Sequence, residues 1–397
     1  MATPSLARRA LRPSLIALAL AAAGVVPALA DAADASPGAF TLQSKYTISL
    51  QHASNPLLSS TAPQSTNGVV LAPELDFGVN LPTFAALLST REDLNGYSTA
   101  GYSSADNHSR ARAQWSGQRW RAGLTGRFDY DTTRTSELGA SGLNTVGVRH
   151  RGIALTPQIT DIVSERDELT AQASYLSGHY ARNTIYNDYR NVGVTTTWLH
   201  LLDPADSVLA SLQLSRFTTL TGAPDKVDNL VPMLGFKRQV NANLSFALSA
   251  GAQRSRSRYL GVDSTTSTYT YAAQLNDKTA QDDFSLSATR SATPQGTGGQ
   301  SLATALDVSD SHKLSELLSV QIAASYVRNS FSVYTPYGAR SYYRIEPSLV
   351  YHPYRDVALS IGVQRSHEGY VVGDQASSTA VELSITITPQ PNGPAFF

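Results

Sequence analysis

Long stretches in which apolar and polar residues alternate one by one run through most of this chain. In "NLSFALSAGAQRS", Leu244, Phe246 and Leu248 occupy every second position, and Ser245 and Ser249 occupy intervening ones. Successive side chains of a β-strand point to opposite faces, so a period of two predicts a strand with one apolar and one polar face. The same alternation occurs in residues 40–50, 120–130, 208–215, 318–326 and 381–388. We therefore expect an all-β protein.

A nine-residue motif shows how the strands are arranged. "ALSAGAQRS" at 247–255 and "ALSIGVQRS" at 358–366 share seven residues at positions 111 apart, and "FSLSATRS" at 284–291 is similar to both. Short turns such as "LDPAD", "VNAN" and "HPYRD" alternate with longer connections, and Pro, Asn and Asp favour turns. The strands that follow short turns start near Ser207, Leu244, Asp282, Leu318 and Val357, at intervals of 36 to 39 residues. One interval holds two strands, so the repeating unit is an up-and-down antiparallel hairpin, and the chain holds about 18 strands (16–18).

Strands of this length favour a transmembrane β-barrel over a soluble sandwich or a propeller. A propeller packs four short strands into a similar repeat, and soluble strands average about 5–6 residues. A strand that crosses a membrane needs about 9–11 residues. Aromatic residues lie near strand ends on the apolar face, as in the aromatic girdles of membrane barrels. They are Trp120, Phe128, Tyr130, Tyr269, Tyr271, Tyr326, Tyr342 and Tyr343. We expect an apolar outer wall in lipid, short periplasmic turns and longer extracellular loops.

The first thirty residues differ from the rest of the chain. Arg8, Arg9 and Arg12 precede a short apolar run that ends in "ALA" at residues 28–30, which is typical of a cleaved signal peptide and too short for a spanning helix. We expect a signal peptide at 1–30, a short disordered segment at 31–38, the β-barrel at 39–388 and a proline-rich tail at 389–397. Removal of residues 1–30 leaves 28 basic against 31 acidic residues, a charge of −3, which gives no reason to expect a nucleic acid partner. The chain has no cysteine, so the exported protein must be stable without disulfides.

The sequence contains no convincing catalytic or metal-binding pattern. The motifs G-x-S-x-G, H-E-x-x-H and the P-loop are absent from it. His367 and Glu368, expected in an outer loop, could at most belong to a barrel enzyme, and a solvated loop histidine is the simpler interpretation. Four acids in "ITDIVSERDELT" could bind calcium, although a solvated turn is the simpler interpretation; they are Asp161, Glu165, Asp167 and Glu168. We expect no enzyme activity, no cofactor and no metal.

The lumen is the remaining candidate for function. An 18-strand barrel leaves an aqueous channel unless it is plugged. The alternation predicts these lumen-facing residues: Lys45, Glu74, Asp76, Arg110, Arg112, Arg121, Arg127, Asp129, Gln253, Arg344, Glu346 and Gln364. Both signs of charge occur, so strong ion selectivity does not follow, and facing pairs such as Arg127 with Glu74 could instead cross-link the walls. Few aromatic residues are expected inside, which disfavours a stacked track for sugars.

Two stretches carry a resemblance to a known group of proteins. In "NDYRNVGVTTTWLHLLDPADSVLASLQLSRF" and "MLGFKRQVNANLSFALSAGAQRS", a loop Asp-Tyr, an alternating strand, a short turn and a second strand follow one another. This order resembles the uncharacterised, porin-like outer-membrane β-barrel proteins that accompany exopolysaccharide gene clusters in Gram-negative bacteria. The resemblance implies a multi-pass barrel in the cell outer membrane and transfers no site residue. One departure is that Phe397 ends the segment "PQPNGPAFF" and not a strand; either the assembly signal is read differently or the last strand lies elsewhere.

Three interpretations follow from the sequence. The first is a porin-like channel for hydrophilic solutes, with a part in exopolysaccharide export. The alternative is a structural scaffold barrel with a closed lumen and partner-binding loops, and the third is a barrel enzyme. The expected partners are outer-membrane lipid, the barrel assembly machinery, and a polysaccharide or small hydrophilic solute.

Overall fold

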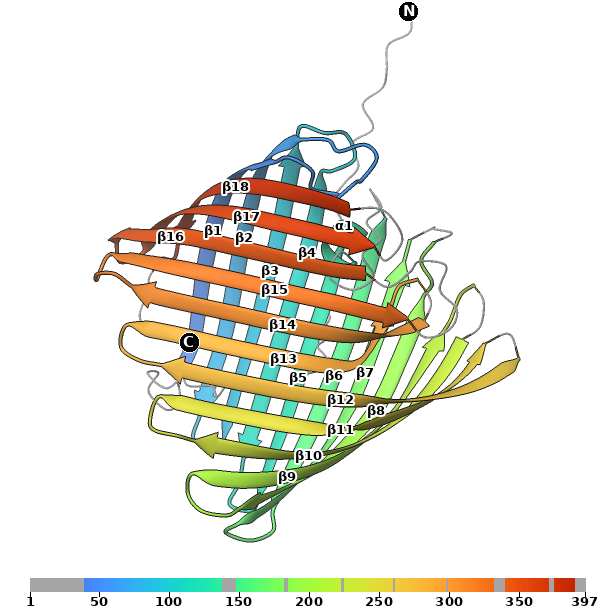
Figure 1. Cartoon of the computed structure of the whole chain (residues 1–397). Helices are drawn as coiled ribbons and strands as arrows, with labels where there is room; N and C mark the ends of the chain where they lie inside the picture. The colour runs from blue at the N-terminus through green and yellow to red at the C-terminus, as the bar shows by residue number, and fades with distance from the viewer. Residues whose placement is uncertain are drawn as a thin grey trace, which may run out of the picture.

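The computed structural model is a single antiparallel sheet rolled into a barrel (Figure 1). It describes residues 39–137, 148–181, 185–222, 225–259, 261–297, 299–331, 340–370 and 375–389. The expected signal peptide, the segment 31–38 and all of the tail except Pro389 lie outside the described residues. The strands are β1 (Ala39–Ala53), β2 (Thr66–Leu81), β3 (Phe84–Tyr97), β4 (Ser104–Ser116), β5 (Trp120–Thr132), β6 (Arg149–Ile162), β7 (Asp167–Tyr180), β8 (Tyr189–Leu201), β9 (Asp206–Thr219), β10 (Asp225–Gln239), β11 (Leu244–Tyr259), β12 (Val262–Lys278), β13 (Asp282–Gln295), β14 (Gly299–Lys313), β15 (Leu318–Phe331), β16 (Arg340–Tyr354), β17 (Val357–Tyr370) and β18 (Gln375–Ile387).

The first and last strands pair with each other and close the barrel. Each strand is antiparallel to its neighbours in sequence, and β1 pairs with β18 from Tyr46 opposite Ile387 to Ala53 opposite Ala380. The expected up-and-down barrel of about 18 strands is confirmed. β18 ends at Ile387, so the last strand lies where the alternation predicted it. Within the described residues, the helix α1 (Thr133–Ser136) has four residues, which is too short to cross a membrane.

The two ends of the barrel have different connections. At one end, here called the short-turn end, connections of two to four residues join β2 to β3, β4 to β5, and so on to β16 and β17. The other end, called the long-loop end, carries connections of up to 16 residues, between β5 and β6. The β11–β12, β13–β14 and β17–β18 connections at this end are exceptions to the expected longer loops, because they have two, three and four residues. Gly261 provides the positive φ of 82° in the first of these tight turns.

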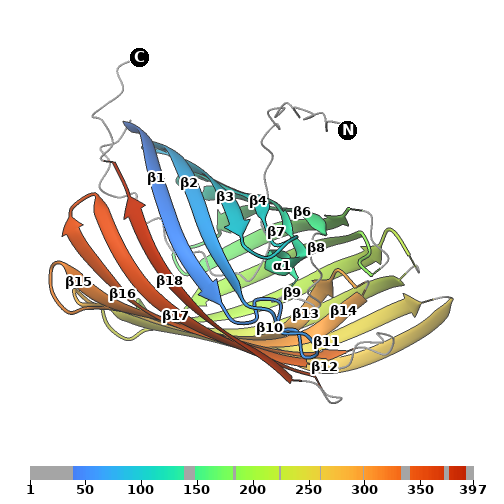
Figure 2. The ribbon, with the colours of Figure 1, turned by 90° about the horizontal axis from the view of Figure 1, so that it is seen from above.

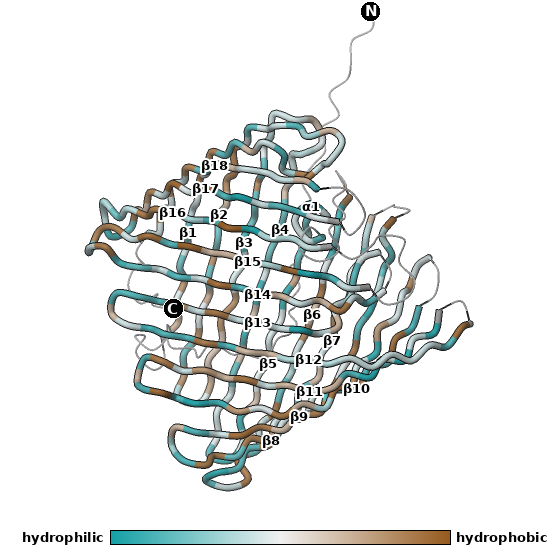
Figure 3. The backbone as a smooth tube through the Cα atoms, in the orientation of Figure 1, coloured by the Kyte–Doolittle hydropathy of each residue, from teal (hydrophilic) through white to brown (hydrophobic). Residues whose placement is uncertain are grey.

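The apolar side of each strand faces outward. Asn229 of β10 donates a hydrogen bond of 2.9 Å to Gln300 of β14, and since these strands are not neighbours in the sheet, the contact crosses the interior. The strand register carries this assignment around the barrel, and it places Leu248 on the outer face opposite Phe236 and Ala273. Leu248 is 51% exposed, like many other outward apolar side chains. Figure 3 shows the resulting alternation of hydrophobic and hydrophilic residues along the strands.

The repeated motif has the same orientation in each strand that contains it. Gln253 of β11 and Gln364 of β17 lie on the inner face, and the arginines that follow them, Arg254 and Arg365, lie on the outer face. Arg290, in the shorter version of the motif in β13, is also outward, opposite Tyr271. The repetition therefore reflects a repeated strand with one fixed inner and outer face.

Four prolines interrupt the sheet without changing which face is outward. Proline has no backbone N–H and cannot donate to the ladder. The register to one neighbouring strand is interrupted beside each of four outward-facing prolines, Pro73, Pro157, Pro232 and Pro347. Beyond each interruption the pairing resumes in the same phase, as in β10, where Leu230 pairs with Arg254 and Met233 with Gly251. The alternation therefore stays in phase past these four prolines, whereas the register between β16 and β17 shifts by one residue between Tyr351 and Tyr354, beside Pro353.

The wall separates between β12 and β13 at the long-loop end. β12 pairs with β13 only from Tyr271, opposite Arg290, to Lys278, so residues 262–270 of β12 have no partner on that side. The ends of β13 and β14 curl into the barrel, where β14 contacts β9 and β10 (Figure 2). β13 and β14 stay paired with each other to Gln295 opposite Gly299. The hairpin therefore enters the lumen as an intact unit.

One feature of the predicted aromatic girdle was wrong. Tyr269, Tyr271, Tyr326 and Tyr343 are outward as expected, but Tyr342 points inward opposite Val327 and is 6% exposed. Tyr342 and Tyr343 are consecutive in a strand, so only one of them can belong to the outer face.

Candidate functional site

A row of charged residues crosses the inner face of β1 to β5. Lys45 forms an ion pair of 3.1 Å with Glu74, and Glu74 lies opposite Arg91 of β3. The row continues through His108 to Asp129. The structure thus brings together three residues predicted for the lumen, namely Lys45, Glu74 and Asp129, and the cations and acids in this row largely compensate one another.

The neighbouring row on the same wall is dominated by arginine. In this row, Asp76 of β2 lies opposite Ser89 of β3, and Ser89 lies opposite Arg110 of β4. Arg110 in turn lies directly opposite Arg127 of β5. Arg112 follows two positions further along β4 on the same face. We refer to Arg110, Arg112 and Arg127 as the arginine cluster. Like charges directly opposite in a sheet repel, so this arrangement favours hydration or a bound anion.

Arg127 is not paired as the sequence suggested. Its ion-pair partner is Asp129 on its own strand, two residues along the same face, and not Glu74, which binds Lys45. Arg110 is exposed and has no ion pair among the described residues. The cross-linking of the walls by Arg127 and Glu74 is therefore not observed.

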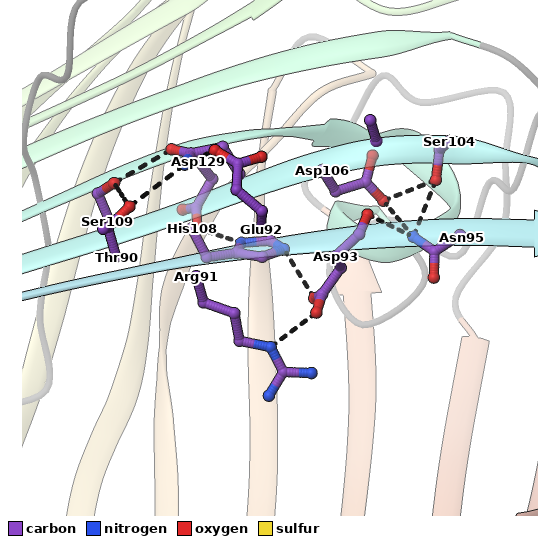
Figure 4. A network of polar contacts seen from close by, with 12 residues as sticks. Thr90, Arg91, Glu92, Asp93, Asn95, Ser104, Asp106, His108, Ser109 and Asp129 are labelled. Atoms are coloured by element: carbon purple, nitrogen blue, oxygen red, sulfur yellow. Dashed lines mark hydrogen bonds and ion pairs between the residues drawn. The ribbon is translucent and has the colours of Figure 1, made fainter. Parts of the chain in front are cut away.

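His108, two residues before Arg110 on the inner face of β4, connects two acids (Figure 4). Its Nδ1 lies 2.9 Å from Asp129, and its Nε2 lies 3.7 Å from Asp93. Asp93 also accepts a hydrogen bond of 2.7 Å from Arg91. Because these side chains come from β3, β4 and β5 and hold one another, this part of the wall is pre-organised.

The remaining charged candidates lie on the inner face away from the cluster. Arg121 pairs with Glu168 of β7 near the short-turn end, and Arg344 pairs with Glu346 along β16. Compact pairs of this kind reduce the net field that each charge contributes to the lumen.

The wall formed by β11, β12 and β13 is uncharged over most of its inner face. Gln253 is buried and donates hydrogen bonds to Asn229 and Ser255, at 3.3 and 2.9 Å. Other inward residues of these strands include Ser249, Thr266, Thr268, Thr270, Gln274, Ser287 and Thr289. Gln364 of β17 donates a comparable hydrogen bond of 3.1 Å to Ser366. Since β13 lies nine strands from β4, this hydroxyl- and amide-rich wall lies across the lumen from the arginine cluster (Figure 1).

The expectation of few inward aromatic residues was wrong. Tyr180, Tyr186, Tyr189 and Phe217, here called the lumen aromatic cluster, pack together with Val227 at the long-loop end. The rings of Tyr180 and Tyr186 are stacked, with centroids 5.0 Å apart and planes 18° apart. Aromatic residues at strand ends suggest a girdle, and only the register shows that Tyr180 and Tyr189 have the inward phase.

Three segments meet inside the barrel beside this cluster. Glu137, directly after α1, is 3% exposed and accepts a hydrogen bond from the hydroxyl of Tyr180. Gly296, at the tip of the β13–β14 hairpin, lies against both: a Cβ added there would be 2.3 Å from the Tyr180 hydroxyl and 2.8 Å from Glu137 Oε1. The Gly296 carbonyl also accepts a hydrogen bond of 2.6 Å from Asn187 N–H. We call this junction of α1, the end of β7 and the hairpin tip the inner crossbar.

The inner crossbar is tied to the wall of β3 and β4 through Arg134 of α1. The guanidinium of Arg134 lies 4.8 Å from the ring centre of Tyr97 and 5.8 Å from that of Tyr102. It also donates a hydrogen bond of 2.5 Å to the Tyr102 carbonyl. Burial raises the pKa of the Tyr102 hydroxyl, against the opposing effect of the nearby Arg134. The segment after β5 therefore spans between the walls of β3 and β7 at the long-loop end.

The side chains considered for catalysis or calcium do not converge. His367 and Glu368 belong to β17 and not to a loop; His367 is outward and stacks on Tyr343, whereas Glu368 is inward and buried. Of the four acids considered for calcium, Asp161 pairs with Arg119 on the outer face and Glu168 points inward. Across the part of the chain that the structure describes, no group of three His, Asp or Glu side chains could hold a metal ion.

Comparisons with known proteins find similar shapes only. No protein-family model matches the chain, and no curated protein matches it. Among solved structures, the FrpB iron transporter from Neisseria meningitidis (F5-1 variant) aligns with 90% of this chain and 83% of its own, at 8% identity and a TM-score of 0.48. Pseudomonas aeruginosa OpdO aligns over 88% and 98%, at 10% identity and a TM-score of 0.46. The outer membrane channel DcaP of Acinetobacter baumannii aligns over 89% and 97%, at 10% identity and a TM-score of 0.44. Similarity at this level does not assign a function to the chain.

Proposed function

We propose that this protein is an outer-membrane channel that passes hydrophilic solutes through its lumen. The observation that carries the proposal is the contrast between the two faces of one closed sheet: outward residues such as Leu248 are apolar, and the inner face carries the charged rows and the hydroxyl-rich wall. In lipid, a barrel pairs its backbone polar groups between strands, and the unpaired edge of β12 at residues 262–270 lies at the long-loop end. About 18 strands enclose a lumen too wide for side chains alone to fill. Residues 1–30 would direct export as a cleaved signal peptide.

A carbohydrate that carries negative charge is the solute that this lumen fits best. The arginine cluster offers guanidinium groups for carboxylates or sulfates, and the facing wall of β11 to β13 offers hydroxyls and amides for sugar hydroxyls. The stacked rings of Tyr180 and Tyr186 add an aromatic surface at the long-loop end. The resemblance to barrels of exopolysaccharide gene clusters leads us to propose export of such a polymer as the physiological direction.

Single-channel recording of the purified full chain in a planar bilayer tests the channel. We expect stepwise conductance. In a salt gradient, the reversal potential of the double variant Arg110→Ala/Arg127→Ala should shift in the direction of greater cation selectivity, because two fixed positive charges leave the lumen wall. Arg216→Ala is a matched control, since Arg216 is an outward arginine in an exposed ion pair with Asp228. An unchanged reversal potential would mean that the arginine cluster does not lie in the path of the solute.

The inner crossbar favours a second candidate, a scaffold barrel whose lumen is closed. Glu137, Tyr180 and Gly296 join three segments across the interior, which narrows the long-loop end. Folded protein that inserts into the bilayer without conducting would support the scaffold and exclude the channel. Conductance combined with normal polysaccharide release in a deletion strain would retain the channel and exclude the export role.

A further inference from the structure

A positively charged patch covers the outer face of β8 to β11 at the long-loop end. Its cations are Arg190, Arg216, Lys226, Arg254, Arg256 and Arg258, and we call these six residues the headgroup patch. The register groups them in neighbouring rows: Arg190 and Lys226 both lie opposite Thr218, and Lys226 lies opposite Arg258. All six have the outward phase, so they do not line the proposed channel.

The acids within these rows balance only part of the charge. Asp263 of β12 pairs with both Arg256 and Arg258, each at 2.7 Å, and Asp228 of β10 pairs with Arg216 at 2.5 Å. Six cations against these two acids leave an excess of four positive charges. Arg190, Lys226 and Arg254 form no ion pair within the residues described. The paired arginines also stay accessible, because the side chains of Arg256 and Arg258 are 63% and 61% exposed.

The headgroup patch directly borders the apolar outer wall. Arg254 lies opposite Leu230, and Leu230 lies opposite Leu214, whose side chain is 51% exposed. Tyr269 of β12 also lies on the outer face, nearer to the short-turn end than the patch, and its side chain is 61% exposed. Exposed aromatic and leucine side chains beneath a cluster of arginines place the cations at the depth of lipid headgroups, if the apolar wall lies in a bilayer.

We propose that the headgroup patch binds the phosphate groups of the phosphorylated glycolipid, lipid A, that forms the outer leaflet of the outer membrane. The planar guanidinium groups of Arg254, Arg256 and Arg258 suit bidentate contacts to phosphate oxygens. Hydroxyls in the same rows, from Thr218 and Thr265, supply additional donors. A second copy of the chain is a poor occupant, because a two-fold contact through this patch would oppose like charges.

The inference assumes the membrane location proposed above but not the channel. Binding of lipid A to the purified full chain in detergent tests it, with lipid A, dephosphorylated lipid A and inorganic phosphate as separate probes. The first variant is Lys226→Gln/Arg254→Gln, which removes two cations without breaking an ion pair. The second is Arg254→Gln/Arg256→Gln/Arg258→Gln. The control Arg119→Gln/Arg238→Gln removes two cations at the short-turn end, where Arg119 and Arg238 pair with Asp161 and Asp206.

We expect the first variant to bind lipid A about 10- to 30-fold more weakly than the unmodified protein, and the triple variant to bind more weakly still. The control should retain full affinity, and dephosphorylated lipid A should bind weakly to all proteins. Inorganic phosphate should compete only at high concentration, because it lacks the acyl chains that contact the wall. Three results would each overturn the proposal. The first variant could bind lipid A as tightly as the unmodified protein, or the control could lose as much affinity as the first variant. In the third, the unmodified protein binds dephosphorylated lipid A as tightly as lipid A. Electrophoretic mobility without heating confirms that each variant is folded, and bilayer conductance, which tests the channel separately, should be unchanged.

Discussion

Replacement of Leu248 by arginine tests whether the outer face of the barrel lies in lipid. Leu248 is the fifth residue of β11 from the short-turn end, on the outer face between Phe236 and Ala273. Four residue steps at a strand tilt near 40° place it about 10 Å along the barrel axis from Leu244. This depth is close to the middle of an apolar band about 25 Å tall, where an outward arginine costs about 2–4 kcal/mol. We expect Leu248→Arg to lower the free energy of unfolding by an amount in the upper part of this range.

The adjacent residue provides the matched control. Ser249 lies on the inner face opposite Gly235 and Ala272, where an arginine can reach the water of the lumen. Ser249→Arg should therefore change the free energy of unfolding by less than about 1 kcal/mol. Reversible urea unfolding in liposomes, followed by tryptophan fluorescence, measures both variants. If the two variants are equally destabilised, or if Ser249→Arg is the worse, the apolar face is a protein interior and the membrane assignment is wrong.

Two further predictions concern the inner crossbar and export. Gly296→Val should displace the β13–β14 tip from Tyr180, because there is no room for the added Cβ. If the hairpin narrows the channel, this variant should raise the single-channel conductance. The control Gly362→Ala, where the nearest contact of the added Cβ is an ordinary 3.4 Å, should leave the conductance unchanged. Unchanged conductance in Gly296→Val would mean that the tip does not limit the flow of ions. N-terminal mass spectrometry of the protein from membranes should find Asp31 as the first residue, because Ala30 completes the cleavage site, and recovery of Met1 would disprove cleavage there.

The sequence was sufficient for the architecture because the same physical rule applies to every strand. A barrel with one apolar and one polar face requires alternation in each strand, and short turns fix where the strands begin. Even the interruption at Pro232 leaves the alternation in phase, since pairing resumes at Met233. The positions of Arg110 and Arg127 on one face follow from the same rule, but their direct opposition depends on the register between β4 and β5, which the alternation within each strand does not specify.

The inner crossbar could not be predicted in this way. Its contacts join Glu137, Tyr180 and Gly296, which are far apart in the sequence and come from segments without a period-two pattern or at strand ends. The inward curl of the β13–β14 hairpin is a tertiary arrangement, and the hairpin keeps its own internal pairing to Gln295. Its sequence therefore looks like that of any other hairpin in the barrel. The inward tyrosines were missed because an aromatic residue near a strand end is compatible with either face until the register is known.

The separation of β12 from β13 gives the two halves of the barrel different mechanical properties. In the middle of the wall, every strand is hydrogen-bonded on both sides, so the circumference there is fixed by the number of strands and their stagger. Beyond Tyr271, β12 has a free edge and the β13–β14 hairpin overlaps it on the inside, as in a rolled sheet whose margins are not joined. Such a roll can widen or tighten when its margins slide past each other, without breaking any ladder in the rest of the wall. The long-loop end is therefore compliant, whereas the middle of the wall is a rigid ring.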